Sequence, residues 1–291
     1  MSGRLLLLCP GQGGQHAGMF DLARSHAGAR AFLARCALPD DPQALFENRV
    51  AQPAIVAATL AMWCALKDGL PAPSLVAGYS IGELAAYGVA GALAPEDTVR
   101  LAGARAALMD AAAAGQAQGL AAVSGIDVAL VRACLPVAII TGHDSCIVGG
   151  TQAQLAALPA RLPAARIHAL PVGVASHTVM MQGAVAPFAA LLADAAYTPP
   201  RVAVLAGIDA TRVLRRELAI DRLSRQLAET IEWAACMDAC VEAGITVALE
   251  LGPGAALARM LQARHPHVAC RSVADFHTLA GVAEWVARAL D

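Results

Sequence analysis

The sequence is poor in charge and in aromatic side chains. Of its 291 residues, 15% are charged, 4% are aromatic and 57% are apolar, with a mean hydropathy of +0.55. A chain of this length and apolar content has room for about two ordinary domains and a substantial core, so intrinsic disorder is excluded. The 21 basic and 23 acidic residues leave a formal charge of −2. No bulk field therefore draws the protein to nucleic acid or to acidic lipid.

Long apolar runs and an export signal are also missing. The longest largely apolar run, Pro53 to Leu66, has 14 residues and is closed by Lys67, whereas a membrane-spanning helix needs about 20. Near the N-terminus, the apolar stretch Leu5 to Cys9 is ended by Pro10, short of the ~7 to 15 residues of a secretory signal core. We therefore expect a cytoplasmic protein with no membrane association.

No CxxC pair occurs among the eight cysteines, which lie mostly among apolar neighbours. Neither a redox dithiol nor a zinc knuckle is indicated. Cys236 and Cys240 are one helical turn apart, but no further ligand accompanies them. We expect free, mostly buried thiols and no metal site.

Short apolar strands alternate with helical segments along most of the chain. The runs Arg4 to Cys9 and Ser74 to Gly78 have the composition of buried strands. Such alternation predicts an α/β fold with a parallel sheet wrapped by helices. Farther along, we expect helices over His177 to Ala195 and Asp221 to Gly244.

Residues 118–176 have a different order of strands and helices. Their strands and helices are expected in the order βαββαβ, which is the ferredoxin-like pattern. The sequence therefore predicts a large α/β domain made of residues 1–117 and 177–291. A ferredoxin-like subdomain, residues 118–176, is inserted into it.

A G-x-S-x-G pattern lies between an apolar strand and a helix, at Gly78-Tyr79-Ser80-Ile81-Gly82. Glycines on both sides of the serine permit a sharp turn. The hydroxyl is then presented at the start of a helix, whose free N–H groups favour developing negative charge. Ser80 is therefore the candidate nucleophile, although a serine that only caps the helix would fit the same pattern.

A serine hydroxyl needs a general base near neutral pH, and histidine has a suitable pKa. Of the eight histidines, His177 follows a run of small residues, 173–176, at the expected subdomain boundary, where clefts usually lie. It is the candidate base. A histidine at the start of a helix can also be purely structural.

Two further features could serve a site beside the serine. The glycine-rich loop Pro10 to Gln15 fits neither a dinucleotide-binding nor a phosphate-binding pattern, but it can aim a backbone N–H at a cleft or form only a tight turn. Arg105 lies on an alanine-rich helix. Its side chain can extend to solvent, or its planar guanidinium can bind a substrate carboxylate through two parallel hydrogen bonds.

In this combination, the chain resembles the malonyl-CoA:acyl-carrier-protein transacylase family. Each matching segment is a weak signal alone, but their common order along the chain is specific. The segments are Pro10 to Gln15, Asn48-Arg49 with Gln52-Pro53, Gly78 to Glu83, the helix of Arg105, Val174 to His177, Arg225 to Leu227 and Leu251 to Gly254. The resemblance implies a hydrolase-like parallel-sheet domain interrupted by a ferredoxin-like subdomain, in agreement with the expected elements.

The resemblance also implies roles by position. Ser80 would be the nucleophile and His177 its base. Gln12 and Ile81 would form the oxyanion hole, Arg105 would bind the substrate carboxylate, and the main-chain carbonyl of Gln226 would orient the histidine. A carbonyl in that place would explain why no acid completes a triad. The implied substrates are malonyl-CoA and the phosphopantetheine-type thiol of an acyl carrier protein. No permanently bound cofactor is implied.

The chain departs from the family at two places. Tyr79 replaces the usual histidine, and His143-Asp144-Ser145 replaces the usual Asn-Ser of the small hairpin. The run Gly78 to Leu93 resembles more closely the epsilon subunit of malonate decarboxylase, which loads malonyl onto that enzyme's carrier subunit. The resemblance therefore favours this subunit over a transacylase of fatty-acid or polyketide synthesis, which performs the same transfer.

Two other functions stay open. A serine hydrolase or thioesterase needs an acid between Ser80 and His177 in the chain. None of the candidates follows a strand at the required position, and Glu83 is too near the serine; the candidates are Glu83, Glu96, Asp97, Asp110, Asp127 and Asp144. A non-catalytic subunit that docks a carrier protein would not need the complete set of predicted site residues.

Overall fold

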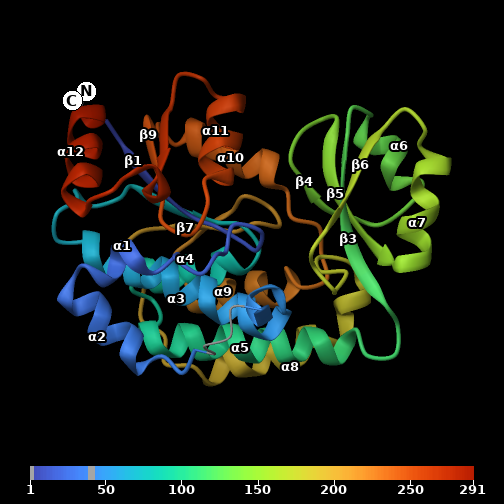
Figure 1. Ribbon diagram of the computed structural model, residues 1–291, viewed down its shortest axis with the longest axis horizontal. Helices are drawn as coiled ribbons and strands as arrows, with labels where there is room; N and C mark the ends of the chain where they lie inside the picture. The colour runs from blue at the N-terminus through green and yellow to red at the C-terminus, as the bar shows by residue number, and fades with distance from the viewer. Residues whose placement is uncertain (1–2, 39–42) are drawn as a thin grey trace.

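The computed structural model describes residues 3–38 and 43–291. Its larger part is built on a central sheet with the strand order β10-β9-β1-β2-β7-β8 (Figure 1). All neighbours are parallel except β8, which runs antiparallel to β7 at the edge. The bounds are β1 Leu5–Cys9, β2 Leu75–Gly78, β7 Val204–Leu205, β8 Arg212–Val213, β9 Val247–Glu250 and β10 Ala269–Ser272. The predicted α/β fold with a parallel sheet is confirmed.

The central strand β1 is apolar along its whole length because helices cover both faces of the sheet. Leu5, Leu7 and Cys9 belong to the buried cluster on one face, and Leu6 and Leu8 belong to the cluster on the other. Alternate side chains of a strand point to opposite faces, so neither set meets solvent. Burial of each leucine contributes roughly 1.5 to 3 kcal/mol.

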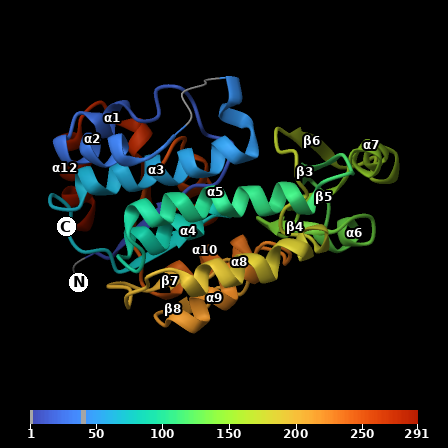
Figure 2. The same ribbon diagram turned by 90° about the horizontal axis from the view of Figure 1, so that it is seen from below.

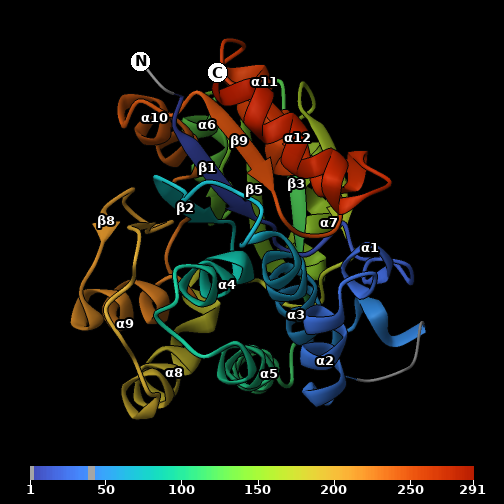
Figure 3. The same ribbon diagram turned by 90° about the vertical axis from the view of Figure 1, so that its left-hand side faces the viewer.

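The helices divide between these two faces. Their bounds are α1 Asp21–Arg24, α2 Ala27–Arg35, α3 Asn48–Leu66, α4 Ile81–Val89, α5 Pro95–Ala112, α8 Gln182–Asp194, α9 Arg216–Arg225, α10 Trp233–Glu242, α11 Ala256–Arg264 and α12 Leu279–Leu290. Helices α3, α4, α5, α8 and α12 pack on one face, while α10 and α11 cover the other (Figures 1 and 3). Figure 2 shows α3, α5 and α8 lying side by side.

Among the described residues, one helix, α3, is long and apolar enough to cross a membrane by length and composition alone. It exceeds the apolar run 53–66 because it begins at Asn48. In the fold, 78% of its most apolar window is buried, and it contacts α1, α2, α4, α5 and α12. It is the central helix of the larger core.

The second sheet is antiparallel and has the order β4-β5-β3-β6. Its elements are β3 Gln118–Ser124, α6 Val128–Arg132, β4 Val137–Ile140, β5 Ser145–Thr151, α7 Gln152–Arg161 and β6 Arg166–Leu170. This is the predicted βαββαβ order of a ferredoxin-like subdomain. It forms the lobe at the right of Figure 1 and has its own small apolar cluster. The domain boundaries at 118 and 176 stay a prediction.

The small sheet joins the large domain through an isolated β-bridge between Ile139 and Ile231. Ile140 N–H donates to the Ile231 carbonyl (2.8 Å), and Ile231 N–H donates to the Ala138 carbonyl (2.9 Å). Ile139 and Leu120 also lie in the buried cluster that holds the side chains of one face of β1. The two lobes therefore share apolar contacts as well as backbone hydrogen bonds.

The structure corrects the helices expected on either side of the site. His177 begins no helix, because its φ of +61° lies in the left-handed region; a short 3₁₀ turn, Val179–Met181, follows, and then α8. The single helix expected over 221–244 is instead α9 and α10, separated by residues 226–232, which form the bridge to the small sheet. The edge strands β8 and β10 give no signal in the sequence because they are short and partly polar.

Candidate active site

The turn at Ser80 is sharp and strained. Strand β2 ends at Gly78 and α4 begins at Ile81, and Ser80 between them has φ +55° and ψ −119°. Such a conformation costs a residue with a Cβ roughly 1 to 3 kcal/mol. A Cβ on Gly78 would lie 2.2 Å from the backbone of Gly82, and a Cβ on Gly82 would lie 2.0 Å from the Cys9 carbonyl oxygen. The glycines of the pattern are therefore required by the close approach of α4 to β1 and β2.

This turn places the serine hydroxyl against the candidate base. Ser80 Oγ lies 2.7 Å from His177 Nε2, and His177 Nδ1 donates to the main-chain carbonyl of Gln226 (2.6 Å). A carbonyl oxygen can only accept, so Nδ1 carries the proton and Nε2 is free to accept one from the hydroxyl. His177 N–H donates to the Leu227 carbonyl (2.8 Å). The main chain at 226–227 thus fixes both the backbone and the ring of the histidine.

The histidine is neutral at physiological pH. Burial is the main cause that lowers the pKa of His177 from 6.5 to about 3; the positive charge of Arg105 lowers it further, and the bond to the Gln226 carbonyl raises it. A neutral imidazole has the free lone pair that a proton acceptor requires.

The guanidinium of Arg105 is buried beside this pair. Arg105 is 2% exposed, so the alternative that its side chain extends to solvent is wrong. Nη1 donates to Gln52 Oε1 (2.7 Å) and Nη2 donates to Gln226 Oε1 (3.1 Å). Burial lowers the pKa of Arg105 to about 10, and the nearby Glu83 raises it. A guanidinium has five N–H donors, so the charged group retains donors for a substrate carboxylate after these two bonds.

Gln226 contacts each of these residues, through its main chain or its side chain. Besides the bonds to His177 and Arg105, its Nε2 donates to the Ser80 carbonyl (3.3 Å) and to Glu83 Oε2 (2.5 Å). The same carboxamide therefore touches the serine turn and the arginine, so these two lie next to each other. Its main-chain carbonyl takes the place that an acid occupies in a Ser-His-Asp triad.

Glu83 belongs to the site, although the pattern around the serine assigns it no role in the transfer. It is 0% exposed, and its Oε2 also accepts the Gly207 N–H (2.9 Å). Burial raises its pKa to about 7, against the lowering effect of the bonds from Gly207 and Gln226 and of the charge on Arg105. A signal was present in the sequence: Glu83 is the one acid in an otherwise apolar helix, where an unpaired carboxylate would be unfavourable.

The glycine-rich loop lies directly against the serine turn. A Cβ on Gly11 would lie 2.8 Å from the Tyr79 carbonyl oxygen and 3.6 Å from Ser80 Cβ, so the next residue, Gln12, follows close to the serine turn. Ile81 is the first residue of α4, where a backbone N–H has no acceptor within the helix. This arrangement suits two N–H donors aimed at an oxyanion. The oxyanion-hole roles of Gln12 and Ile81 stay predictions.

A cavity of about 510 Å³ opens at His177, between the two lobes. Its walls include Arg132 and Leu135 from the subdomain side and Val179 and Ile208 from the large domain. A volume of this size is typical of small-molecule sites, which often lie at domain junctions. His177 lies in the wall of this cavity, whereas Ser80, Gln12 and Arg105 do not line it.

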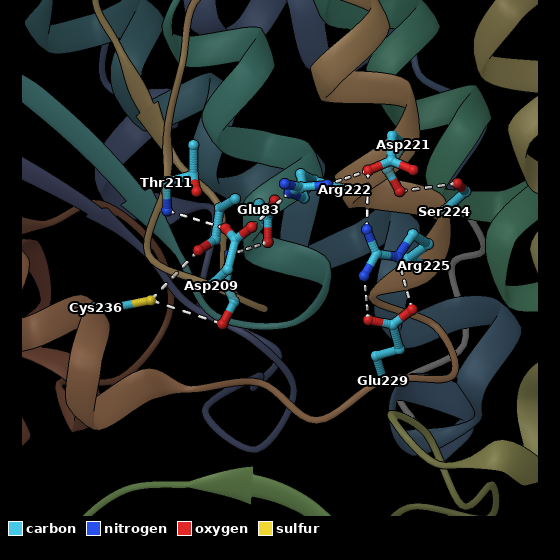
Figure 4. A network of polar contacts seen from close by, with 11 residues as sticks. Glu83, Asp209, Thr211, Asp221, Arg222, Ser224, Arg225, Glu229 and Cys236 are labelled. Carbon is cyan, nitrogen blue, oxygen red and sulfur yellow. Dashed lines mark hydrogen bonds and ion pairs between the residues drawn. The ribbon is translucent and has the colours of Figure 1, made fainter.

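Helix α9, which ends at the histidine-orienting segment, is held by ion pairs (Figure 4). Arg222 Nε lies 2.7 Å from Asp209 Oδ2, and the same side chain also pairs with Asp221. Arg225 pairs with Asp221 (3.2 Å) and with Glu229 (2.7 Å). The Arg222–Asp209 pair ties α9 to the loop after β7, and the Arg225–Glu229 pair ties the end of α9 to the main chain that follows it.

The family model described as acyl transferase domain matches residues 6–281. The chain belongs to the acyl transferase family. The acyltransferase is 33% identical to the malonyl CoA-acyl carrier protein transacylase of Mycobacterium tuberculosis over 306 aligned positions, which cover 96% of this chain and 100% of the relative. It is 29% identical to the Escherichia coli protein of the same name over 279 positions, covering 85% of this chain and 88% of the relative.

Solved structures agree with the fold of the acyltransferase. The crystal structure of FabD from Acinetobacter baumannii superposes with a TM-score of 0.91 at 25% identity, over 99% of this chain and 100% of that one. MCAT from Mycobacterium tuberculosis superposes with a TM-score of 0.88 at 32% identity, over 96% of this chain and 99% of that one. A malonyl-transacylase solved in complex with a type II polyketide synthase acyl-carrier protein gives 0.88 at 26% identity, over 97% and 99%. The fold class and the assignment as an acyltransferase are confirmed.

Proposed function

We propose that this acyltransferase is a malonyl-CoA:acyl-carrier-protein transacylase of fatty-acid or polyketide synthesis. The observation that carries the proposal is the Ser80–His177 contact with the charged Arg105 buried beside it. Two relatives and one solved structure that are named as malonyl transacylases match this chain over 88% to 100% of their own length. They support this function over the malonate decarboxylase epsilon subunit that the sequence of the serine turn favours.

In the first half-reaction, His177 Nε2 takes the proton of Ser80 Oγ as the oxygen attacks the thioester carbonyl of malonyl-CoA. The oxyanion that forms accepts hydrogen bonds from the N–H groups of Gln12 and Ile81. One such donor contributes about 3 to 4 kcal/mol to the lowering of the barrier. When the carbon–sulfur bond breaks, the coenzyme A sulfur receives the proton from the imidazolium. The product is a malonyl-Ser80 ester.

In the second half-reaction, the same histidine takes the proton of the carrier protein's phosphopantetheine-type thiol. The sulfur attacks the ester carbonyl, the carbon–oxygen bond to Ser80 breaks, and Oγ recovers the proton from His177. The overall exchange converts one thioester into another, so it is close to thermoneutral and reversible. No further cofactor takes part, and coenzyme A enters only as its thioester.

Arg105 supplies the selectivity for malonyl in this proposal. A planar guanidinium binds a carboxylate through paired, charge-assisted hydrogen bonds, and its burial makes the pairing stronger than at a surface. A hydrolase reaction is less favoured, because the partner of His177 Nδ1 is a main-chain carbonyl and not an acid. The location of the enzyme in the cytoplasm stays a prediction.

Incubation with radiolabelled malonyl-CoA tests the proposal. We expect an acid-stable malonyl-enzyme that is lost in Ser80→Ala and kept in Ser74→Ala, a serine outside the site. His177→Ala should slow its formation by about 10² to 10⁴-fold. A protein that never becomes labelled would support a non-catalytic docking subunit, and release of malonate without an added carrier would support a hydrolase.

The second substrate distinguishes the two malonyl-transfer functions. We expect labelled malonyl to pass from the enzyme to a holo-acyl carrier protein of fatty-acid or polyketide synthesis. Transfer to the carrier subunit of malonate decarboxylase at a higher rate would instead restore the decarboxylase role.

A further inference from the structure

Two opposite charges are buried on either side of one carboxamide. Arg105 of α5 donates to Gln226 Oε1 (3.1 Å), and Gln226 Nε2 donates to Glu83 Oε2 of α4 (2.5 Å). The guanidinium can only donate and an ionised carboxylate can only accept. The two charges therefore hold the carboxamide in one orientation, with its oxygen toward Arg105.

The charges around Glu83 disfavour the binding of a second anion. Two neighbours shift the pKa of Glu83 by their charge: Arg105 on α5 and Asp209 after β7. Glu83 in turn raises the pKa of Tyr87 on α4 and of Cys236 on α10. Of these, Arg105 is the cation, and Asp209 pairs with Arg222. With Arg105 and Glu83 both ionised, the buried pair is neutral. A substrate carboxylate bound to Arg105 would leave two anions beside one cation, which is strongly unfavourable in a buried site.

The carboxyl group of Glu83 has a free position for a proton. Its Oε2 accepts both hydrogen bonds, from Gln226 and Gly207, whereas its Oε1 has no partner among the described residues. The hydroxyl of Tyr87, one turn along α4, is likewise buried with no partner in the described part of the chain. A proton on Oε1 therefore breaks no existing bond of the carboxyl group.

We propose that Glu83 is a positioning residue that, above neutral pH, is anionic in the free enzyme and takes up one proton when a malonyl carboxylate binds Arg105. The inference rests on the proposed function. The only bond formed is the O–H bond on Oε1, with a proton from solvent. An acetyl group brings no charge to Arg105 and so requires no proton. Glu83 thereby couples the charge of the acyl group to the protonation of the site.

The ionisation of Glu83 fits such a role. Because its pKa is about 7, protonation near neutral pH costs little free energy, while well above pH 7 Glu83 is an anion in the free enzyme. A second anion nearby raises this pKa further. Proton uptake is then largest above pH 7 and falls at lower pH, where the free enzyme is already protonated.

The test counts protons by calorimetry in two buffers of different ionisation enthalpy, with Ser80→Ala to prevent acylation. At pH 8, we expect uptake approaching about one proton per malonyl-CoA bound and close to none for acetyl-CoA. Acetyl-CoA is the matched control because it carries the same coenzyme A phosphates. At pH 6, the uptake with malonyl-CoA should be small.

The double variant Ser80→Ala/Glu83→Gln assigns the proton. The carboxamide oxygen of the introduced glutamine can accept both bonds made to Glu83 Oε2, and the neutral group mimics the protonated acid. We expect no proton uptake and, at pH 8, about tenfold tighter malonyl-CoA binding than in Ser80→Ala alone, because a pKa near 7 leaves about a tenth of the parent protonated at that pH. The two proteins should bind almost equally at pH 6. A merely structural role predicts weaker binding at both pH values.

The outcomes separate this inference from the proposed function. If Ser80→Ala does not bind malonyl-CoA, the proposed function fails. If it binds without proton uptake, or if uptake persists in the double variant, the role of Glu83 is overturned; loss of that uptake in Ser80→Ala/His177→Gln would then assign the proton to the histidine. If thermal unfolding shows that the double variant is not folded, the proton uptake of Ser80→Ala at pH 8 and pH 6 tests the role of Glu83 by itself.

Discussion

At the residue scale, the proposed chemistry depends on Gln226, whose main-chain carbonyl accepts a hydrogen bond from His177 and whose side chain accepts one from Arg105. A carbonyl orients the imidazole as an acid would, yet it adds no charge. That difference matters beside Arg105, because an additional carboxylate there would compete with an anionic substrate for the guanidinium. The missing triad acid is thus consistent with selection of a charged acyl group.

Substitution of Arg105 tests this selectivity. Arg105→Ala leaves a substrate carboxylate buried without a partner, a loss on the order of 3 to 5 kcal/mol, so malonyl-enzyme formation should collapse while acetyl-enzyme formation is spared or gains. The comparison is made from acylation rates with labelled malonyl-CoA and acetyl-CoA. Arg100→Ala is the control, since Arg100 is an exposed residue of the same helix that pairs with Asp97. Equal losses with both acyl groups would make Arg105 structural.

The low pKa of His177 makes stability depend on pH. In the unfolded chain the ring takes a proton below about 6.5, while in the folded protein its pKa is about 3. Between these values the unfolded state binds more protons, so the contribution of His177 to the free energy of unfolding is complete above pH 6.5 and is lost as pH falls.

A comparison with His177→Gln isolates this contribution. From pH 7 to pH 5, the wild-type protein should lose about 2 kcal/mol more stability than the variant. Urea unfolding at the two pH values measures the difference. Parallel losses in both proteins would show that the ring is not held in its neutral form.

At the scale of elements, the position of Ser80, the proposed nucleophile, depends on how closely α4 approaches β1. Gly82 lies on the first turn of α4, against the carbonyl groups at the end of β1. The contact brings the start of α4 to the carboxyl ends of the parallel strands, where the glycine-rich loop also lies. In open α/β sheets this edge is the usual place for a ligand.

Two glycine substitutions separate close packing from helix propensity. In Gly82→Ala the added methyl group meets the Cys9 carbonyl, so we expect a loss of about 3 kcal/mol or more and no malonyl-enzyme. In Gly103→Ala, on α5, the new Cβ has no neighbour within 4 Å, so the helix should gain about 0.5 to 1 kcal/mol with unchanged acylation. Denaturant unfolding and labelling measure both. A Gly82→Ala protein of normal stability and activity would contradict the packing described.

At the scale of the whole molecule, the two lobes are joined by the bridge at Ile231 and by a shared apolar cluster. The cavity at His177 lies at this junction. Residues of both lobes line this cavity, so its width depends on how the lobes pack against each other.

Ile139, buried at the junction, tests this coupling. Ile139→Ala should cost about 2 to 5 kcal/mol. Hydrogen exchange should become faster both in the small sheet and in the segment around Ile231, because both lose a buried contact. Faster exchange confined to the small sheet would show that the lobes are independent.

The sequence determined the parts of this protein that depend on near neighbours. Apolar runs predicted strands such as β1 and β2, the two glycines predicted the turn at Ser80, and the βαββαβ order predicted the subdomain. The tertiary structure decided burial and hydrogen-bond partners: the charge of Arg105 inside the protein, the left-handed backbone of His177 and the carboxylate of Glu83 under the site. Arg105 and Glu83 both bond the side chain of Gln226, which is 121 and 143 positions away from them. No local pattern encodes such a contact, because it exists only once the chain has folded.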